Sequence, residues 1–144
     1  MTSFDFSQYL AAFNGTDEAA FVRKFYTEDL VVEGPPGVIR GHQQWLKALA
    51  FVHERVEERL HPVTVVQDGD VILAEVRGVF TATADRADFP YGALRKGESV
   101  TVKMLAKYEL RGNQIARLTL ASWPAAEDVK QDTGSGSPQS GPRR

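Results

Sequence analysis

The side chains best suited to chemistry in this sequence are its histidines, which titrate near neutral pH and can exchange protons with a bound molecule. His42 opens a predicted helix, where its ring could face a small molecule; a histidine at the surface or capping the helix is the alternative. His53 and His61 are expected to be solvated. No spacing of His with Asp or Glu predicts a metal site.

Three tyrosines are candidates for orienting a ligand. Tyr9, Tyr26 and Tyr108 each lie on an otherwise apolar face of a predicted element. A tyrosine ring can pack there, while its hydroxyl needs a hydrogen-bond partner. Each is therefore either a polar group in a pocket or part of a packed core. Trp45 and Trp123 are likewise either an aromatic wall or core residues.

Charged residues alternate with apolar ones along the predicted strands, which places them on one face of a sheet. We expect the charges to pair across strands on the outer face. Leu73 and Leu105 share that face, and a sheet face that combines apolar and charged residues suits a homodimer surface. The alternative places Glu75 or Lys103 in the pocket, which would require a slipped register or a bulge at Gly78. The charged set comprises Glu75, Arg77, Lys103, Lys107, Glu109 and Arg117.

The elements that position these residues begin with two helices. Apolar residues recur with helical spacing from Phe6 to Phe13, and a second helix ends near Phe25. A strand over Leu30–Glu33 then reaches a Gly-Pro-Pro-Gly corner at 34–37. A second short strand, Val38–Arg40, follows the corner.

A third helix is predicted behind this corner. The helix follows Gly41, and its pattern of apolar residues runs from His42 to Leu60. A helix that ends near His53, with a strand from Val56, is the alternative. In the longer version Glu58 belongs to the solvated side of the helix.

Long strands follow the helices. Their side chains alternate between apolar and mixed faces, and Gly78 in the middle of one strand predicts a bend or bulge. A longer connection, Asp85 to Gly97, separates the middle pair and could line a pocket mouth. The strands are predicted over Val63–Gln67, Val71–Thr83, Val100–Leu110 and Gln114–Trp123.

Composition excludes several classes of protein. The 144 residues, 42% hydrophobic and 25% charged, fit one globular domain. A net charge of −2 argues against a nucleic-acid partner. Without cysteine there is no disulfide framework. No apolar run is long enough for a membrane span and the first residues lack a signal-peptide pattern, so a cytoplasmic protein is expected.

The element order resembles that of the nuclear transport factor two-like superfamily. The resemblance is carried by YTEDLVVEGPPGVIRGHQQW, from Tyr26 to Trp45, and by YELRGNQIARLTLASW, from Tyr108 to Trp123. These segments are similar to the corner and the closing hairpin of SnoaL-like cyclases and ketosteroid isomerase-like proteins. The resemblance covers about residues 4–124 and implies an α+β fold. In that fold a curled antiparallel sheet wraps three N-terminal helices into a cone-shaped barrel with a pocket at its mouth.

The catalytic residues of ketosteroid isomerases do not carry over. Their aspartate falls on Gly34, their tyrosine near Leu10 beside Tyr9, and their protonated acid near Ala106. Proton transfer needs a base within reach of the substrate, and Glu33 should face the other side of its strand. The histidine pair of scytalone dehydratase and the Asp-Arg-Asp set of epoxide hydrolases are not matched either.

The resemblance and the apolar interior together predict a SnoaL-like domain over residues 1–125 and a polar tail over residues 126–144. The expected function is a cofactor-independent isomerase, dehydratase or cyclase acting on an apolar or aromatic carbonyl compound. A non-catalytic ligand-binding or homodimerisation module is the alternative. The proposed catalytic residues are Tyr26, His42, Glu33 and Asp85, with a tyrosine or His42 donating to the carbonyl and an acid moving the proton. The proposed substrate-binding residues are Tyr9, Phe13, Trp45, Leu49, Phe80, Met104, Tyr108 and Trp123.

Overall fold

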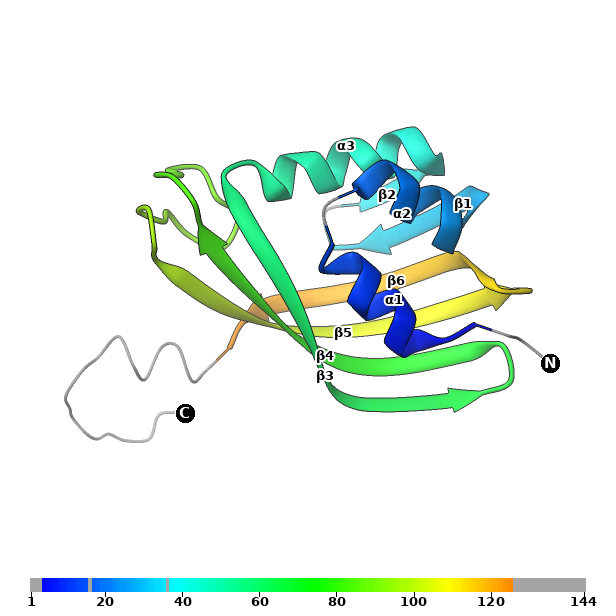
Figure 1. Cartoon of the computed structure of the whole chain (residues 1–144). Coiled ribbons are helices and arrows are strands. Elements are labelled where there is room, and N and C mark those ends of the chain that lie inside the picture. The colour runs from blue at the N-terminus through cyan, green and yellow to red at the C-terminus, as the bar shows by residue number, and fades with distance from the viewer. Residues whose placement is uncertain (1–3, 16, 36, 126–144) are drawn as a thin grey trace.

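Helices lie on the concave side of one curled six-stranded sheet in the computed structural model of this chain (Figure 1). The structure describes residues 4–15, 17–35 and 37–125. The predicted tail, residues 126–144, lies outside them. The helices are α1 (Phe6–Phe13), α2 (Glu18–Phe25) and α3 (Gly41–His53). The strands are β1 (Tyr26–Gly34), β2 (Gly37–Arg40), β3 (Val56–Asp68), β4 (Val71–Ala82), β5 (Ser99–Arg111) and β6 (Gln114–Pro124).

The strand order across the sheet is β2-β1-β6-β5-β4-β3. Neighbouring strands are antiparallel, except that β1 and β6 are parallel. Parallel neighbours need a long connection, and α3 with the four strands β2, β3, β4 and β5 provides it. The α+β class is confirmed. The sheet is mostly, rather than wholly, antiparallel, and β2 and β3 form its two edges instead of closing a barrel.

The third helix is shorter than its apolar pattern predicts. It ends at His53, and β3 begins at Val56, so the alternative boundary is correct and an end at Leu60 is wrong. Arg55 makes the turn with a φ of 60°, a left-handed conformation that few residues other than glycine adopt. Hydrogen bonds from Thr83 to the Arg55 carbonyl and from Arg55 to the Asp85 carbonyl hold this turn. Tertiary contacts therefore end the helix where the local sequence has no stop signal.

Tyr9 on α1 and Tyr26 at the start of β1 are buried in the core. Asp5 caps α1 by accepting a hydrogen bond from the amide of Ser7 at 2.9 Å. α2 ends at Phe25 and β1 begins at the next residue, Tyr26, without a loop. The predicted strand Leu30–Glu33 is therefore only the second half of β1.

The long strands alternate as predicted. On β4, Ile72, Val76 and Phe80 are buried, and Leu73 between them is exposed. Of the bend or bulge predicted at Gly78, the bulge is wrong, because Gly78 pairs regularly with both neighbouring strands. The register shift lies in β3 instead, after Pro62, whose ring nitrogen has no hydrogen for the ladder.

A buried arginine anchors the connection between β4 and β5. The Arg86 guanidinium donates to the carbonyl of Glu54 at 2.6 Å, just past the C-terminus of α3, and to the Asp88 carboxylate at 2.8 Å. It also stacks on Phe51 and Phe89. This anchor holds the connection against the end of α3.

Candidate active site

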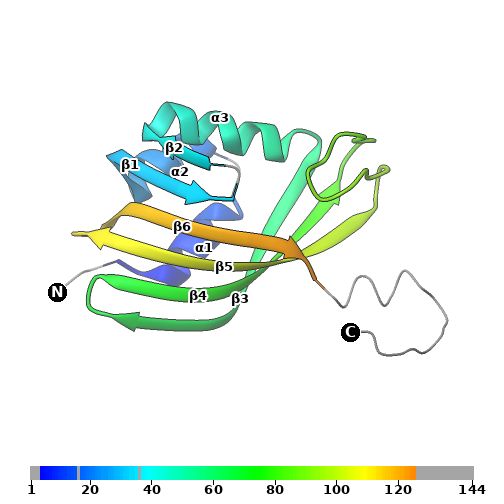
Figure 2. The same cartoon turned by 180° about the vertical axis from the view of Figure 1, so that it is seen from behind.

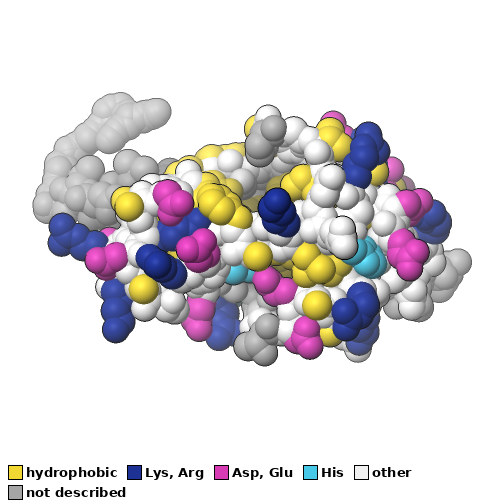
Figure 3. Space-filling view, turned by 90° about the horizontal axis from the view of Figure 1, so that it is seen from above, with side chains coloured by type: hydrophobic (Ala, Val, Ile, Leu, Met, Phe, Trp, Pro, Cys, Tyr) yellow, Lys and Arg dark blue, Asp and Glu magenta, His cyan; other side chains and the backbone are white. Residues whose placement is uncertain are grey.

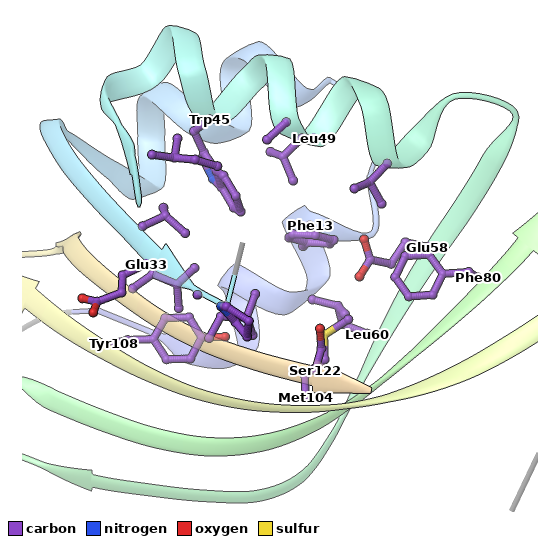
Figure 4. A pocket seen from close by; sticks show the side chains of 18 of the residues that line it. Phe13, Glu33, Trp45, Leu49, Glu58, Leu60, Phe80, Met104, Tyr108 and Ser122 are labelled. Atoms are coloured by element: carbon purple, nitrogen blue, oxygen red, sulfur yellow. The ribbon is translucent and has the colours of Figure 1, made fainter. Parts of the chain in front are cut away.

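The concave side of the sheet encloses a cavity of about 250 Å³. Apolar side chains from α3, β1 and the long strands form most of its wall, and Figure 4 shows how they converge. Its polar groups are few, and they include Tyr91, Ser122 and Glu58. A small, mostly apolar cavity with a few polar groups suits a small organic ligand. The predicted ligand-contacting residues found in its wall are Tyr9, Phe13, Trp45, Leu49, Phe80, Met104 and Tyr108.

Trp123 does not contribute to this wall. Its side chain is 42% exposed and lies on the outer face of the sheet. Leu118, Leu120 and Ser122 on β6 face the cavity, and side chains alternate along a strand. The residue after Ser122 therefore faces away, and the predicted aromatic wall lacks this tryptophan.

The carboxylate of Glu58 faces the cavity, among Phe13, Leu60 and Phe80 (Figure 4). Only 6% of its side chain is exposed. The prediction that Glu58 is solvated is wrong, because β3 begins at Val56 and strand alternation replaces the helical period. The sequence does hold a signal: Val56, Glu58 and Leu60 occupy alternate positions of a strand, so the glutamate shares the face of two buried residues.

His53, the last residue of α3, links this carboxylate to a second one. Its Nε2 donates to Oε1 of Glu58 at 2.7 Å, and its Nδ1 donates to Oε2 of Glu18 on α2. Both partners are carboxylates, so a ring that serves both is most stable as the doubly protonated imidazolium. The ring also lies edge-on to Phe13, with centroids 5.9 Å apart. The prediction that His53 is solvated is wrong, because its ring is held between these groups.

Burial and charge set the protonation of this pair. Burial raises the pKa of Glu58 above its ordinary value of 4.5, an effect that His53 opposes and the charge of Glu18 increases. Burial alone would lower the pKa of His53, but the hydrogen bonds and charges of Glu58 and Glu18 outweigh it and raise that pKa above 6.5. A carboxyl with a raised pKa beside an imidazolium is suited to exchange protons near neutral pH.

Gly78 leaves room for this carboxylate. A β-carbon at Gly78 would lie 3.4 Å from Oε2 of Glu58 and 2.6 Å from the terminal carbon of Met104. Oε1 is bonded to His53, so Oε2 is the oxygen beside this space. The absence of a side chain at residue 78 therefore keeps the second oxygen of Glu58 accessible from the cavity.

A pair of tyrosines lies at another part of the wall. The hydroxyls of Tyr9 and Tyr26 are 2.7 Å apart. Tyr9 and Tyr108 line the cavity, while Tyr26 is fully buried behind Tyr9 and is not among the lining residues. Burial raises the pKa of all three above the ordinary value of 10.0. Their hydroxyls are therefore neutral at physiological pH and can act as hydrogen-bond donors.

His42 does not reach the cavity. Its Nε2 lies 2.9 Å from the carbonyl oxygen of Tyr26, to which it donates. Because β1 starts directly after α2, this carbonyl sits at the junction of the two elements, and His42 covers it from the first turn of α3. The ring therefore binds the backbone at the α2–β1 junction and does not cap α3, whose start has no side-chain cap.

The carboxylates of the two predicted acids, Glu33 and Asp85, are hydrogen-bonded to other groups of the protein. Glu33 borders the cavity, but its carboxylate points away (Figure 4) and accepts from Arg117 at 2.6 Å on the outer face. Asp85 accepts from the backbone amide of Lys96 at 2.9 Å and fixes its own loop. Alternation along β1 turns Glu33 outward, and the loop's hydrogen bonds hold Asp85. Neither carboxylate faces the tyrosines of the cavity.

The described residues contain no cluster of His, Asp and Glu arranged to hold a metal ion. None of their helices is long and apolar enough to cross a membrane. Acidic and basic side chains are interspersed on the face seen in Figure 3. That face therefore offers no extended positive surface of the kind that binds nucleic acid.

Comparison with known proteins agrees with this geometry. The model of the SnoaL-like domain matches residues 6–118, so the chain belongs to the SnoaL-like family. Its fold is that of the nuclear transport factor two-like superfamily, as the sequence resemblance predicts. No curated protein matches the sequence.

Several solved structures share the fold. A candidate polyketide cyclase from Pseudomonas putida KT2440 has a TM-score of 0.68 at 24% identity, over 91% of this chain and 97% of that one. IdmH, a candidate polyketide cyclase from Streptomyces antibioticus, has a TM-score of 0.66 at 22% identity, over 81% and 90%. An epoxide hydrolase-like protein from M. tuberculosis has a TM-score of 0.62 at 17% identity, over 87% and 83%. At these identities the likeness establishes the fold alone.

Proposed function

We propose that this protein is a cytoplasmic enzyme that isomerises, dehydrates or cyclises an apolar or aromatic carbonyl compound by proton transfer. The observation that supports it is a buried carboxylate, Glu58, held by His53 at 2.7 Å in the wall of an otherwise apolar cavity. Perturbed ionisable groups in a cavity are typical of acid–base sites. The similarity to candidate polyketide cyclases agrees with this class of substrate.

In the proposed reaction Glu58 acts as the base. Its free oxygen, Oε2, removes a proton from the carbon beside the carbonyl group. The electrons of that C–H bond move to the carbonyl oxygen, which a neutral tyrosine hydroxyl, Tyr9 or Tyr108, stabilises by donating a hydrogen bond. The proton then returns to another carbon in an isomerisation or to a leaving hydroxyl in a dehydration. In a cyclisation the enolate carbon instead forms a C–C bond with a second carbonyl carbon, whose C–O π bond breaks, and the oxygen takes the proton from Glu58. Each route begins with proton removal by Glu58, returns that proton to the product and changes no oxidation state of the whole molecule.

The test is proton exchange on a simple aromatic ketone. β-Tetralone in deuterium oxide should gain deuterium beside its carbonyl faster with the protein than in buffer. Glu58→Gln should lower the enzymatic rate by about a hundredfold, the usual contribution of a general base. Glu33→Gln, the same change at the cavity rim, should leave the rate unchanged. No acceleration by the wild-type protein, or an unaffected Glu58→Gln variant, would overturn the proposal.

We also propose that two copies of the protein pair through the outer face of the sheet, which is turned towards the viewer in Figure 2. Leu73 is 53% exposed there and Leu105 is 46% exposed. Lys103 lies 3.7 Å from Glu75 beside them. An apolar centre flanked by charges of both signs is complementary to the same surface of a second copy. A two-fold axis brings the two apolar centres together and can place each charge opposite a residue of the other sign on the second copy.

The oligomeric state tests this pairing. Leu105→Arg should convert a dimer into a monomer in light scattering after size exclusion, because it places a charge in the apolar centre. Ala50→Arg, on the exposed side of α3, is the matched control and should remain dimeric. A wild-type protein that is monomeric, or a dimeric Leu105→Arg variant, would contradict the proposed interface.

A further inference from the structure

Two hydroxyl groups in the cavity wall have no part in the proposed reaction. Ser122 continues the apolar row of Leu118 and Leu120 on β6, and Tyr91 lies in the connection between β4 and β5. Their hydroxyl oxygens are hydrogen-bonded at 2.5 Å. Both residues are half-buried. The pair therefore adds hydrogen-bonding groups to a wall that is otherwise mostly apolar.

The Tyr91 hydroxyl is held in place by the packing of its ring. The ring centroid lies 5.6 Å from that of Phe80 and 5.7 Å from that of Phe89. Backbone hydrogen bonds of 2.7 and 2.9 Å between Arg86 and Leu94 close the segment that contains it. A group that is already ordered loses little conformational freedom when a ligand binds to it. Tyr91 is therefore suited to hold a ligand oxygen.

The pair can still form hydrogen bonds with a ligand. A hydroxyl group has one hydrogen to donate and two lone pairs that accept. The bond between Tyr91 and Ser122 uses one hydrogen and one lone pair, so the pair keeps one hydrogen and three lone pairs. An alcohol or phenol matches this set, because it both donates and accepts, and a carbonyl oxygen accepts the remaining hydrogen.

The pair lies at a different place along the cavity from Tyr108. Tyr108 and Met104 are four residues apart on β5, and Met104 pairs with Ser122 on β6. Four residues of a strand span about 13 Å. Figure 4 shows Ser122 near Met104, on the side of the cavity where Glu58 lies, and Tyr108 on the other side. A ligand that is held at both places needs two oxygen atoms.

We propose that Tyr91 and Ser122 form a binding subsite for a second oxygen atom of the substrate, in a hydroxyl or carbonyl group away from the reacting carbonyl. This inference rests on the proposed function, because it extends the carbonyl compound proposed above to one with two oxygen substituents. Tyr91 and Ser122 bind the substrate and exchange no proton with it. A ligand without the second oxygen leaves the remaining hydrogen of the pair facing apolar atoms, which weakens its binding.

Binding of two aromatic alcohols tests the subsite without any reaction. β-Naphthol has one hydroxyl, and the symmetric naphthalene diol has a second one at the opposite end of the ring pair. In calorimetry the wild-type protein should bind the diol about fivefold more tightly, the effect of one net hydrogen bond. The double variant Tyr91→Phe, Ser122→Ala should bind the two alcohols with nearly equal affinity.

The variants keep the test independent of folding. Tyr91→Phe retains the ring that packs on Phe80, and Ser122→Ala alone removes a single oxygen and should already lower the preference for the diol. Ser99→Ala is the matched control. The Ser99 hydroxyl is also hydrogen-bonded to another hydroxyl, that of Thr81 at 2.7 Å, but Ser99 is exposed and is not among the residues that line the cavity. This variant should keep the full preference.

The outcomes separate the subsite from the proposed function. A wild-type protein that binds both alcohols equally, or neither, overturns the subsite, as does a double variant that keeps the preference. Loss of the preference in Glu58→Gln alone would place the second oxygen at Glu58 instead. The proposed function is decided by deuterium exchange on β-tetralone, which has a single oxygen and does not need the subsite. Failure of that exchange with an intact preference for the diol removes the reaction and leaves the subsite.

Discussion

A β-carbon on Gly78 would lie 3.4 Å from Oε2 of Glu58, so residue 78 borders the oxygen of the buried carboxylate that is not bonded to His53. The same β-carbon would lie 2.6 Å from the end of Met104, which would have to move. Residue 78 thus controls the space around the proposed base.

We expect Gly78→Ala to fold but to lose much of the ketone-exchange activity. Crowding costs about 1–3 kcal/mol in a packed site, whereas alanine in a strand regains about 0.5–1 kcal/mol relative to glycine. Urea unfolding should therefore show a small loss of stability. Adding Met104→Val removes the crowded atoms and should restore stability and activity together. A single variant with full activity would show that this space is not used.

His53 should titrate above its ordinary pKa of 6.5, because Glu58 and Glu18 stabilise the imidazolium more than burial destabilises it. Ring NMR signals followed against pH measure this value directly. Glu58→Gln should lower the midpoint more than Glu18→Gln, since Glu58 has the larger influence on the ring. A midpoint in the wild-type protein at or below 6.5 would contradict the arrangement.

The stability of the fold should depend on pH with a defined sign. The folded-state pKa of His53 is raised above 6.5, so the folded protein binds the proton more tightly than the unfolded chain. That stabilisation is complete below pH 6.5 and is lost as the pH rises through the folded-state value. The raised pKa of Glu58 contributes in the same direction, because its stabilisation is complete below pH 4.5 and is lost as the pH rises through the folded-state value. Urea midpoints should therefore fall as the pH rises above 6.5, and His53→Gln should flatten this fall.

Acid should destabilise the fold by the opposite effect. Hydrogen bonds from Thr27 to Asp29 and from Arg86 to Asp88 lower the pKa of each carboxyl below 3.8. Their stabilisation is present above pH 3.8 and is lost as the pH falls through the lowered values. Urea midpoints measured down to low pH should be highest between two regions. One is the acidic region where this stabilisation is lost, and the other is the region above pH 6.5 where the stabilisation from His53 is lost.

The hydroxyls of Tyr9 and Tyr26, 2.7 Å apart and buried, should be energetically coupled. Tyr26→Phe leaves the Tyr9 hydroxyl without that partner and should cost about 1–2 kcal/mol of unfolding free energy. Tyr9→Phe should cost a similar amount. The double variant should cost less than the sum of the two, because the second change removes a group already left unpaired. Additive values in urea unfolding would show that the contact contributes nothing.

Much of the fold follows from the sequence because the strong local signals agree with the tertiary structure. Alternation along β4 and β5 predicts which side chains are buried, and the element order predicts a hollow under the curled sheet. Phe80, Met104 and Tyr108 line that hollow because they lie on the predicted inner face.

The sequence does not predict Glu58, the proposed base, for a reason that no local pattern reveals. Val52, Val56 and Leu60 fit a helix as well as a helix followed by a strand. Arg55 adopts a φ of 60° without glycine at that position, so the turn before Glu58 has no local sequence signal. Glu33 and Asp85 are the acids that the sequence predicts near the mouth, but Arg117 and the backbone amide of Lys96 bind them. Such partners become neighbours only when the sheet forms.

The parallel contact between β1 and β6 also affects how the protein is made. A ribosome releases Tyr26 long before Ile115, its partner on the last strand. The part of the cavity wall where Val32 pairs with Leu118 can therefore assemble only after synthesis has passed Leu118. Until then the apolar side chains of the future cavity have no cover, and nascent chains halted before residue 114 should depend on chaperones.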